Sequence, residues 1–425
     1  MNKTNILLPV MGLACVSLLV ACGGGGGGSS SNDDGTPTIL TGIFNDSPVD
    51  GLAYDCAPSG QSGTTQNGGA FSYVAGDTCT FSLGAVVLGS AAAAPIVTPV
   101  ELVANGTPSN PTVVNIVQLL TTADDDGDPS NGINIPAAVS TAAEDATGVD
   151  VQSGTFDLDP AVVQMVADMH AAGSGSSILT DPVVAQAHIE ATATCVYSGL
   201  YNGIWSGGPL DGEWTVVVPP DLSVQGFSED TDGGSGSWSG SYNPSTNSFA
   251  LSGSHVGVSF EPDPINYPGS FTTPSMTGTA TGSSAGTGDV SGTMEGTVSF
   301  SPNYDSPLLA PQDGSGIFSG ARLGGSATAK YRYTGFYYLT GSSAPTGVFT
   351  VDISDSGEAT GTTFNYVTNE IGSLSGAAAN GTISGIGATT TANISYDHTA
   401  GTMTGTWSDT DGYDGALSAS GCQLN

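Results

Sequence analysis

Three aspartates at alternate positions are the residues of this chain whose type and spacing point most directly to chemistry. Asp124, Asp126 and Asp128 stand in the segment DDDGDPSNG. In calcium-binding loops, alternate residues direct oxygen ligands at one hard cation. Pro129 occupies the place of the usual glycine, and Ile135 that of the bidentate glutamate of an EF-hand. The spacing predicts a partial or differently closed calcium site, with a solvated acidic loop after a helix as the alternative.

One segment has the spacing of a hydrolase nucleophile. Residues 282–286 read GSSAG, which fits G-x-S-x-G. A nucleophile elbow needs a strand before the serine and a helix after it, and the flanking sequence predicts neither. The histidines are scattered along the chain at His170, His188, His255 and His398. We therefore expect no enzymatic activity, and a hydrolase that uses an unrecognised Ser or Asp is the weaker alternative.

The N-terminal segment carries signals for export and lipid attachment. Lys3 precedes an apolar run from Ile6 to Val20, and the segment Leu19–Cys22 reads LVAC. The run is about fifteen residues, shorter than the roughly twenty that a membrane helix needs. This segment resembles a bacterial lipoprotein signal peptide that ends in a lipobox. A plain signal peptide that happens to end near a cysteine is the alternative.

The lipoprotein resemblance implies a processed and anchored protein. Residues 1–21 are expected to be removed, the Cys22 thiol to receive a diacylglycerol, and the new amino terminus to be acylated, typically with palmitate. Two or three acyl chains anchor a protein stably, whereas one chain does not. Gly23 rather than Asp follows the cysteine, which resembles lipoproteins exported to the outer membrane. Membrane attachment through Cys22 is thus expected, with the side that the protein faces left open.

Four further cysteines follow the signal segment. An even number in an exported protein predicts disulfides, and four cysteines allow three pairings. We favour Cys56–Cys79 and Cys195–Cys422, because each pair then lies within one structural unit.

The charge of the chain excludes one class of partner. Four basic residues stand against 39 acidic ones, for a formal net charge of −35. Loss of Lys3 with the signal peptide leaves only Arg322, Lys330 and Arg332 as basic residues. Such a field repels DNA and RNA, so we expect no nucleic-acid partner. It favours divalent cations and cationic partners, although solubility in a salty medium also explains it.

The elements that position these residues are predicted to be mainly β. Only 10% of the residues are charged and 63 are glycine, a composition that favours many short strands and tight turns. After the signal peptide, residues 22–37 form a Gly/Ser-rich flexible tether. The expected units then follow in order: a β-sandwich at 38–104, a helical segment with the acidic loop at 105–194, and β-barrel-like units at 195–325 and 326–425.

The first of these units carries a recognisable pattern. Residues 42–54 read GIFNDSPVDGLAY, and residues 63–73 read GTTQNGGAFSY. The Asn-Gly pair followed by alternating Phe71 and Tyr73 predicts a hairpin. These segments resemble the transthyretin-like or carboxypeptidase-regulatory β-sandwich. The resemblance implies a spacer or binding module rather than catalysis.

Helices are expected in the next segment. Residues 113–120 carry apolar positions at helical spacing. Asp159-Pro160 and Asp181-Pro182 each place a capping side chain before a proline at the first helical position.

From Cys195 onward the chain repeats itself with a period near 135 residues. The segment 197–201 (YSGLY) matches 333–337 (YTGFY), and 212–217 (GEWTVV) matches 347–352 (GVFTVD), after which Gly226 matches Gly361. Further on, 276–279 (MTGT) matches 403–406 (MTGT). The repeat predicts a duplicated up-and-down β-unit with about seven strands per copy. Its texture is similar to that of the barrel domains of transferrin-binding-protein-B-type surface lipoproteins. We expect the four tryptophans to be buried: Trp205, Trp214, Trp238 and Trp407.

The sequence thus predicts a lipid-anchored envelope lipoprotein with a non-catalytic surface-binding or structural role toward an unknown protein or glycan. The alternative is a ligand-capturing barrel for a small apolar ligand, a glycan or an iron carrier. That alternative requires a cavity inside one barrel copy, with inward polar groups. Calcium at the acidic loop is the one cofactor that the sequence suggests.

Overall fold

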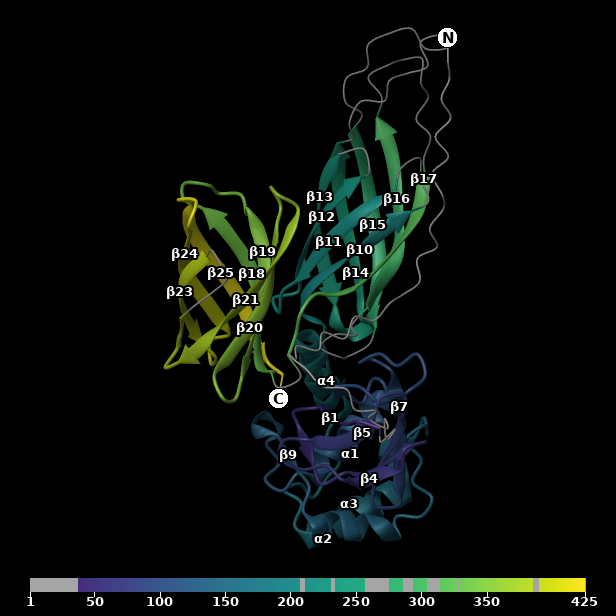
Figure 1. Cartoon of the computed structure of the whole chain (residues 1–425). Helices are drawn as coiled ribbons and strands as arrows, with labels where there is room; N and C mark the ends of the chain where they lie inside the picture. The colour runs from purple at the N-terminus through teal and green to yellow at the C-terminus, as the bar shows by residue number, and fades with distance from the viewer. Residues whose placement is uncertain are drawn as a thin grey trace, which may run out of the picture. The chain divides into compact units, whose positions relative to one another are not determined.

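The computed structural model describes residues 37–206, 211–230, 234–256, 275–285, 293–303, 314–326, 329–384 and 390–424. The lipobox, Cys22 and nearly all of the tether lie outside these residues. Thr38–Asn425 form one compact unit. Its fold is mainly β and multidomain, as predicted (Figure 1). None of the helices in the described part of the chain has the length and apolar character of a membrane span.

Two small sheets begin the fold. The first has the order β5-β1-β8 and the second β4-β3-β6-β7, while β2 pairs with β9. The strands are β1 (Ile39–Phe44), β2 (Val49–Asp50), β3 (Ala53–Ala57), β4 (Gln61–Thr64), β5 (Ala70–Val74), β6 (Thr78–Leu83), β7 (Val86–Ala92), β8 (Ile96–Val97) and β9 (Ile133–Asn134).

The turn predicted between 63 and 73 forms, and one antiparallel bridge between Gln66 and Ala70 closes it, but the strands on either side do not pair with each other. Asn67 and Gly68 have φ values of 58° and 82°, as a tight two-residue turn requires. However, β4 pairs with β3 and β5 pairs with β1. Phe44 N donates to Gly69 O and holds the end of the turn against β1. The turn therefore carries the chain from one sheet to the other.

Helices follow between the sheets and the barrels. They are α1 (Pro111–Ala123), α2 (Ala137–Ala142), α3 (Pro160–Ala172) and α4 (Pro182–Tyr197), with short 3-10 turns η1 (Pro129–Asn131), η2 (Ala143–Asp145) and η3 (Phe156–Leu158). Asp159 accepts a hydrogen bond from Ala161 N, and Asp181 accepts one from Val183 N. Both predicted helix starts are confirmed.

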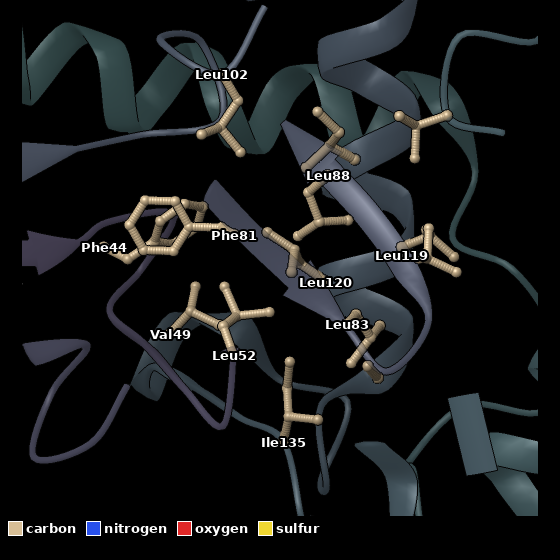
Figure 2. Close-up of a cluster of buried hydrophobic side chains, with 14 of the residues drawn as sticks. Phe44, Val49, Leu52, Phe81, Leu83, Leu88, Leu102, Leu119, Leu120 and Ile135 are labelled. Atoms are coloured by element: carbon tan, nitrogen blue, oxygen red, sulfur yellow. The ribbon is translucent and has the colours of Figure 1, made fainter. Parts of the chain in front are cut away.

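The sheets and the helices share one hydrophobic core. Figure 2 shows Leu119 and Leu120 of α1 beside strand residues such as Phe81, Leu83 and Leu88. Leu119 and Leu120 are fully buried, and burial of one such side chain contributes about 1.5–3 kcal/mol. The strands of 38–104 and the helices of 105–194 therefore stabilise each other.

Two closed barrels complete the chain. The first consists of β10 (Gly199–Ser206), β11 (Gly212–Val218), β12 (Ser223–Asp230), β13 (Ser235–Asn243), β14 (Ser248–Val256), β15 (Ser275–Ala285), β16 (Thr293–Asn303) and β17 (Gly314–Arg322), with the turn η4 (Pro244–Thr246) between β13 and β14. The second consists of β18 (Ala329–Leu339), β19 (Gly347–Ser354), β20 (Glu358–Asn365), β21 (Glu370–Ala379), β22 (Thr382–Ser384), β23 (Thr390–Asp397), β24 (Thr402–Asp409) and β25 (Asp414–Gln423).

Each barrel has eight strands rather than about seven. The eighth strand closes the sheet, because β17 pairs with β10 and β25 pairs with β18. Pairing between the first and last strands removes both sheet edges.

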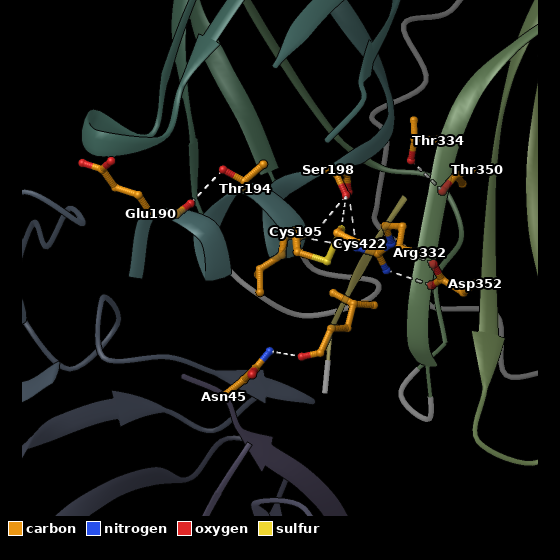
Figure 3. Close-up of a disulfide and its surroundings, with 12 residues drawn as sticks. Asn45, Glu190, Thr194, Cys195, Ser198, Arg332, Thr334, Thr350, Asp352 and Cys422 are labelled. Carbon is orange, nitrogen blue, oxygen red and sulfur yellow. Dashed lines mark hydrogen bonds and ion pairs between the residues drawn. A yellow bond between two sulfur atoms is a disulfide. The ribbon is translucent and has the colours of Figure 1, made fainter. Parts of the chain in front are cut away.

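Both favoured disulfides are confirmed. Cys56–Cys79 joins β3 to β6, and Cys195–Cys422 joins α4 to β25. The second bond links residues 227 positions apart. It lies where the end of the helical segment and the last strand of the chain meet (Figure 3).

Candidate functional sites

One end of the second barrel holds a cavity of about 900 Å³, which we call the cup. Its base is formed by apolar side chains that also belong to the barrel core, among them Phe349, Ile394 and Leu417. Its rim is formed at the hairpin between β20 and β21 and at the hairpin between β24 and β25, where Asn369 and Asp411 lie. A cavity of this size falls in the usual range for small-molecule sites.

The other half of the barrel is packed. Val351 and Ile353 of β19 meet Ile383 and Met403, and all four side chains are buried. The cup therefore ends on a solid base rather than continuing as a channel.

Two aromatic side chains line the cup with their polar atoms already bonded. Trp407 Nε1 donates to Tyr338 O at 3.2 Å, and Tyr337 OH donates to Phe364 O at 3.3 Å. Their rings pack edge to face with centroids 5.7 Å apart, and burial raises the pKa of the Tyr337 hydroxyl. These contacts fix both rings in place, so that the two rings present apolar surface to the interior of the cup.

The rim of the cup is acidic. Glu370, Asp409 and Asp411 line it, and the described lining includes no Lys, Arg or His. Asp409 Oδ1 accepts hydrogen bonds from Asp411 N at 3.0 Å and Tyr413 N at 2.9 Å, which fixes this hairpin. The negative charge of the rim disfavours anionic ligands.

The strand register explains why the second barrel has this space. Gly226 lies beside Trp238 in the first barrel, and Gly361 lies beside Leu374 in the second. Trp238 therefore matches Leu374, and the same comparison along the other strands matches Trp214 with Phe349 and Phe318 with Leu417. In each of these three pairs the second barrel has the smaller side chain.

In the described part of the first barrel, these aromatic rings fill the interior. The Trp214 and Phe318 rings pack edge to face at 5.4 Å, and Phe249 lies 5.8 Å from Phe318. Trp214 is buried as expected, while Trp205 and Trp238 are partly buried against the same cluster. Smaller side chains at matching positions therefore open the cup in the second barrel alone, as far as the structure describes the two.

The acidic loop begins where α1 ends. Asp124 is fully buried and its Oδ1 accepts a hydrogen bond from Asn134 N at 2.9 Å, but its Oδ2 has no hydrogen-bond partner. Oxygen atoms of Asp124, Asp125 and Asp126 lie within 4.8 Å of one another. Burial, reinforced by the Asp126 and Asp125 carboxylates, raises the pKa of Asp124 to about 6.

The third predicted ligand lies outside this group. Asp128 Oδ1 accepts hydrogen bonds from Ser130 N at 3.1 Å and Ser130 Oγ at 2.6 Å, and so caps η1. Asp126 accepts from Asn131 Nδ2 and from Asp128 N, both at 2.8 Å, and these bonds lower the pKa of Asp126. The carboxylate of Asp125, a residue outside the predicted alternate spacing, is thus grouped with those of Asp124 and Asp126.

The described histidines have structural partners. His188 Nε2 lies 3.0 Å from Asp46 O and 3.3 Å from Asp46 Oδ1. His398 stacks on Tyr331 with ring centroids 3.4 Å apart, and His170 Nδ1 lies 3.0 Å from Ser174 O. His255 is on β14 with its side chain outside the described residues.

The GSSAG segment has no elbow geometry within the described residues. Its first four residues continue β15, which runs to Ala285, and Gly286 lies outside them. Its serines therefore stand within a strand and not at a strand-to-helix turn.

Two of the three basic residues that follow Lys3 in the sequence, Arg322 and Arg332, lie at the carboxyl end of α4. Arg322 Nη2 donates to Val196 O and to Tyr201 OH. Figure 3 shows Arg332 beside Ser198, to whose carbonyl oxygen Arg332 Nη1 donates. Lys330 pairs with Asp355 at 2.8 Å. Positive charge at a helix carboxyl end is favourable, so the two buried arginines stabilise this junction rather than forming an exposed basic surface.

No protein family and no curated protein matches this chain. Three solved structures are similar to parts of it. A protein of unknown function from the DUF3598 family of Nostoc punctiforme is 8% identical, over 55% of this chain and 97% of its own, with a TM-score of 0.15. A protein described as a candidate AttH from Nitrosomonas europaea is 8% identical, over 52% and 92%, with a TM-score of 0.17. Immune modulator A of Aeromonas veronii is 13% identical, over 52% and 93%, with a TM-score of 0.14. Likeness at this level says nothing of what this chain does.

Proposed function

We propose that this protein is a lipid-anchored lipoprotein of the cell envelope whose second barrel binds a small apolar ligand in the cup. The observation that carries the proposal is the cavity of about 900 Å³, with its apolar base and polar rim. It supports the ligand-capturing barrel over a purely structural role, because a structural barrel gains stability from a filled interior.

The chemistry of the lining selects the class of ligand. The rings of Tyr337 and Trp407 and the side chain of Leu374 offer apolar surface. The carboxylates of Glu370 and Asp409 at the rim favour an uncharged or cationic head group and oppose an anionic one,. An amphiphile with an apolar body and a neutral or positive end fits both features, whereas an anionic iron carrier does not.

Three ligands of equal chain length test this selection. We expect dodecyltrimethylammonium and dodecanol to bind the chain more tightly than dodecanoate in calorimetric titrations, with the two ionic ligands kept below their micelle concentrations and dodecanol below its solubility limit. A Cys22→Ala chain avoids the detergent that would compete for the cup. Equal affinity for dodecanoate would refute the role of the acidic rim.

Variants that fill the cup test its location. Leu374→Trp with Leu417→Phe restores the larger side chains of the first barrel, and we expect it to weaken dodecanol binding at least tenfold because the space is occupied. Val367→Trp is the matched control, since Val367 is 76% exposed and lies outside the described lining. Unchanged binding in the filled variant, with its cooperative thermal unfolding retained, would place the ligand elsewhere.

The anchor is tested separately. Cys22→Ala removes the thiol that would carry the diacylglycerol, so we expect the protein to move from the membrane fraction to the soluble fraction. Detergent-phase partitioning that persists in this variant would contradict the lipoprotein assignment without bearing on the cup.

A further inference from the structure

A buried carboxylate oxygen at the end of α1 lacks a partner. Asp124 is fully buried, and its Oδ2 has no hydrogen-bond donor within reach. A buried oxygen of this kind destabilises the fold unless a donor or a cation satisfies it. The environment of Asp124 Oδ2 therefore indicates what is bound there.

That environment is made of other carboxylates. The ligand oxygens of Asp124, Asp125 and Asp126 all lie within 4.8 Å of one another. Calcium binds oxygens at about 2.3–2.6 Å, so two oxygens on one ion are at most about 5 Å apart. The spacing of the three side chains fits a shared divalent cation, whose charge would also offset the repulsion between the three carboxylates.

The surrounding hydrogen bonds hold these carboxylates in place. Asn134 Nδ2 donates to Asp125 Oδ2 at 2.6 Å, and Asn131 Nδ2 donates to Asp126 Oδ2 at 2.8 Å. A carboxylate oxygen has more than one acceptor site, so an oxygen that accepts one hydrogen bond can still bind a metal.

We propose that Asp124, Asp125 and Asp126 form a calcium site, with water completing the coordination. Calcium is favoured over magnesium because it accepts irregular sets of six to eight oxygens, whereas magnesium demands near-octahedral geometry. The loop joins several elements: Asp125 N donates to the carbonyl oxygen of Asn134 in β9, and Gly175 N, which follows α3, donates to the carbonyl oxygen of Asp124. Calcium therefore stabilises the helical segment.

The test uses the full chain in a neutral detergent, stripped of metal with EDTA. We expect calcium at a hundredfold excess over its dissociation constant to raise the melting temperature by roughly 5 °C. Sodium chloride at matched ionic strength should produce a smaller rise, because it supplies only the screening that the two salts share and does not bind the site. Calorimetric titration should give one calcium ion per chain and weaker binding of magnesium.

Variants assign the ligands. Asp125→Asn with Asp126→Asn changes two exposed side chains and should abolish the calcium-specific rise. Asp128→Asn is the control and should retain that rise, because Asp128 caps η1 outside the cluster. Asp124→Asn should melt higher than the wild type without metal, since a neutral amide replaces a buried acid, and should not respond to calcium. A full response in the double variant, or its loss in Asp128→Asn, would overturn this site.

Discussion

Arg332→Met is expected to lower the free energy of unfolding of the second barrel by about 3–5 kcal/mol. Arg332 Nε and Nη2 donate to the two oxygens of Asp352 at 2.7 and 2.8 Å, and both side chains are at most 2% exposed. Removing the guanidinium leaves the Asp352 carboxylate buried without its counter-charge. Urea unfolding followed by tryptophan fluorescence measures the loss.

Two further variants separate the ion pair from other effects. Lys330→Met removes a cation two positions away, but its partner Asp355 is 83% exposed, so the change should be at most about 1 kcal/mol. Adding Asp352→Asn to Arg332→Met should recover much of the loss, since no buried charge then remains and the amide oxygen still accepts from Ser326 N. Equal destabilisation by Arg332→Met and Lys330→Met would show that the pair contributes little.

Local signals predicted the helical segment and the disulfides well. A capping aspartate before a proline specifies a helix start through its own side chain, so Asp159 and Asp181 could be read without knowledge of the fold,. The expectation that each cysteine pair lies within one unit holds for Cys56–Cys79, but not for Cys195–Cys422, which joins the last helix to the second barrel. Nothing local showed that α1 packs into the core of the two sheets, because that contact depends on tertiary structure.

The repeat was read correctly in part. The matches of Trp214 with Phe349 and of Gly226 with Gly361 hold in the strand register. In the first strand, however, Gly203 rather than Gly199 occupies the position of Gly335.

The MTGT match fails for a topological reason. Residues 276–279 lie on β15, the sixth strand of their barrel, whereas 403–406 lie on β24, the seventh. The register places Gly296 of β16 opposite Phe318, as Gly405 lies opposite Leu417. Short patterns of glycine and threonine recur on many barrel strands, so sequence alone does not tell which strands correspond.

The cup could not be predicted for the same reason. Replacement of Trp238 by Leu374 has meaning only when both are known to occupy the same place in their barrels. The spacing of the aspartates predicted the position of the acidic loop, but not which of the aspartates come together in it. Asp128 is at the predicted spacing yet caps a turn, and hydrogen bonds from Asn134, ten residues after Asp124, hold the carboxylates of Asp124 and Asp125.

Asp46→Asn is expected to stabilise the protein at pH 8 and to leave its stability unchanged at pH 4. Asp46 is fully buried, and burial raises its pKa from 3.8 to about 6, while the charge of the neighbouring His188 lowers it in part. A raised pKa means that the folded state holds this proton more tightly than the unfolded state does. The contribution of protonated Asp46 to the free energy of unfolding is fully present below pH 3.8 and is lost as pH rises through about 6,.

The size of the effect follows from the shift. About two pKa units correspond to about 3 kcal/mol between the protonated and charged forms of Asp46. The amide that replaces this carboxyl group cannot ionise, so the variant should lack this loss between pH 4 and pH 8. Urea unfolding of both proteins across that range gives the difference, and the titrations of groups that do not contact Asp46 cancel.

Asp157→Asn, at an exposed side chain, is the control and should change stability little at either pH. His188→Gln should enlarge the loss in the chain that keeps Asp46, because the charge that favours the carboxylate is removed. A constant difference between the wild type and Asp46→Asn from pH 4 to pH 8 would mean that Asp46 does not titrate in this range. The contact between His188 and Asp46 would then act only through its hydrogen bond to the backbone carbonyl.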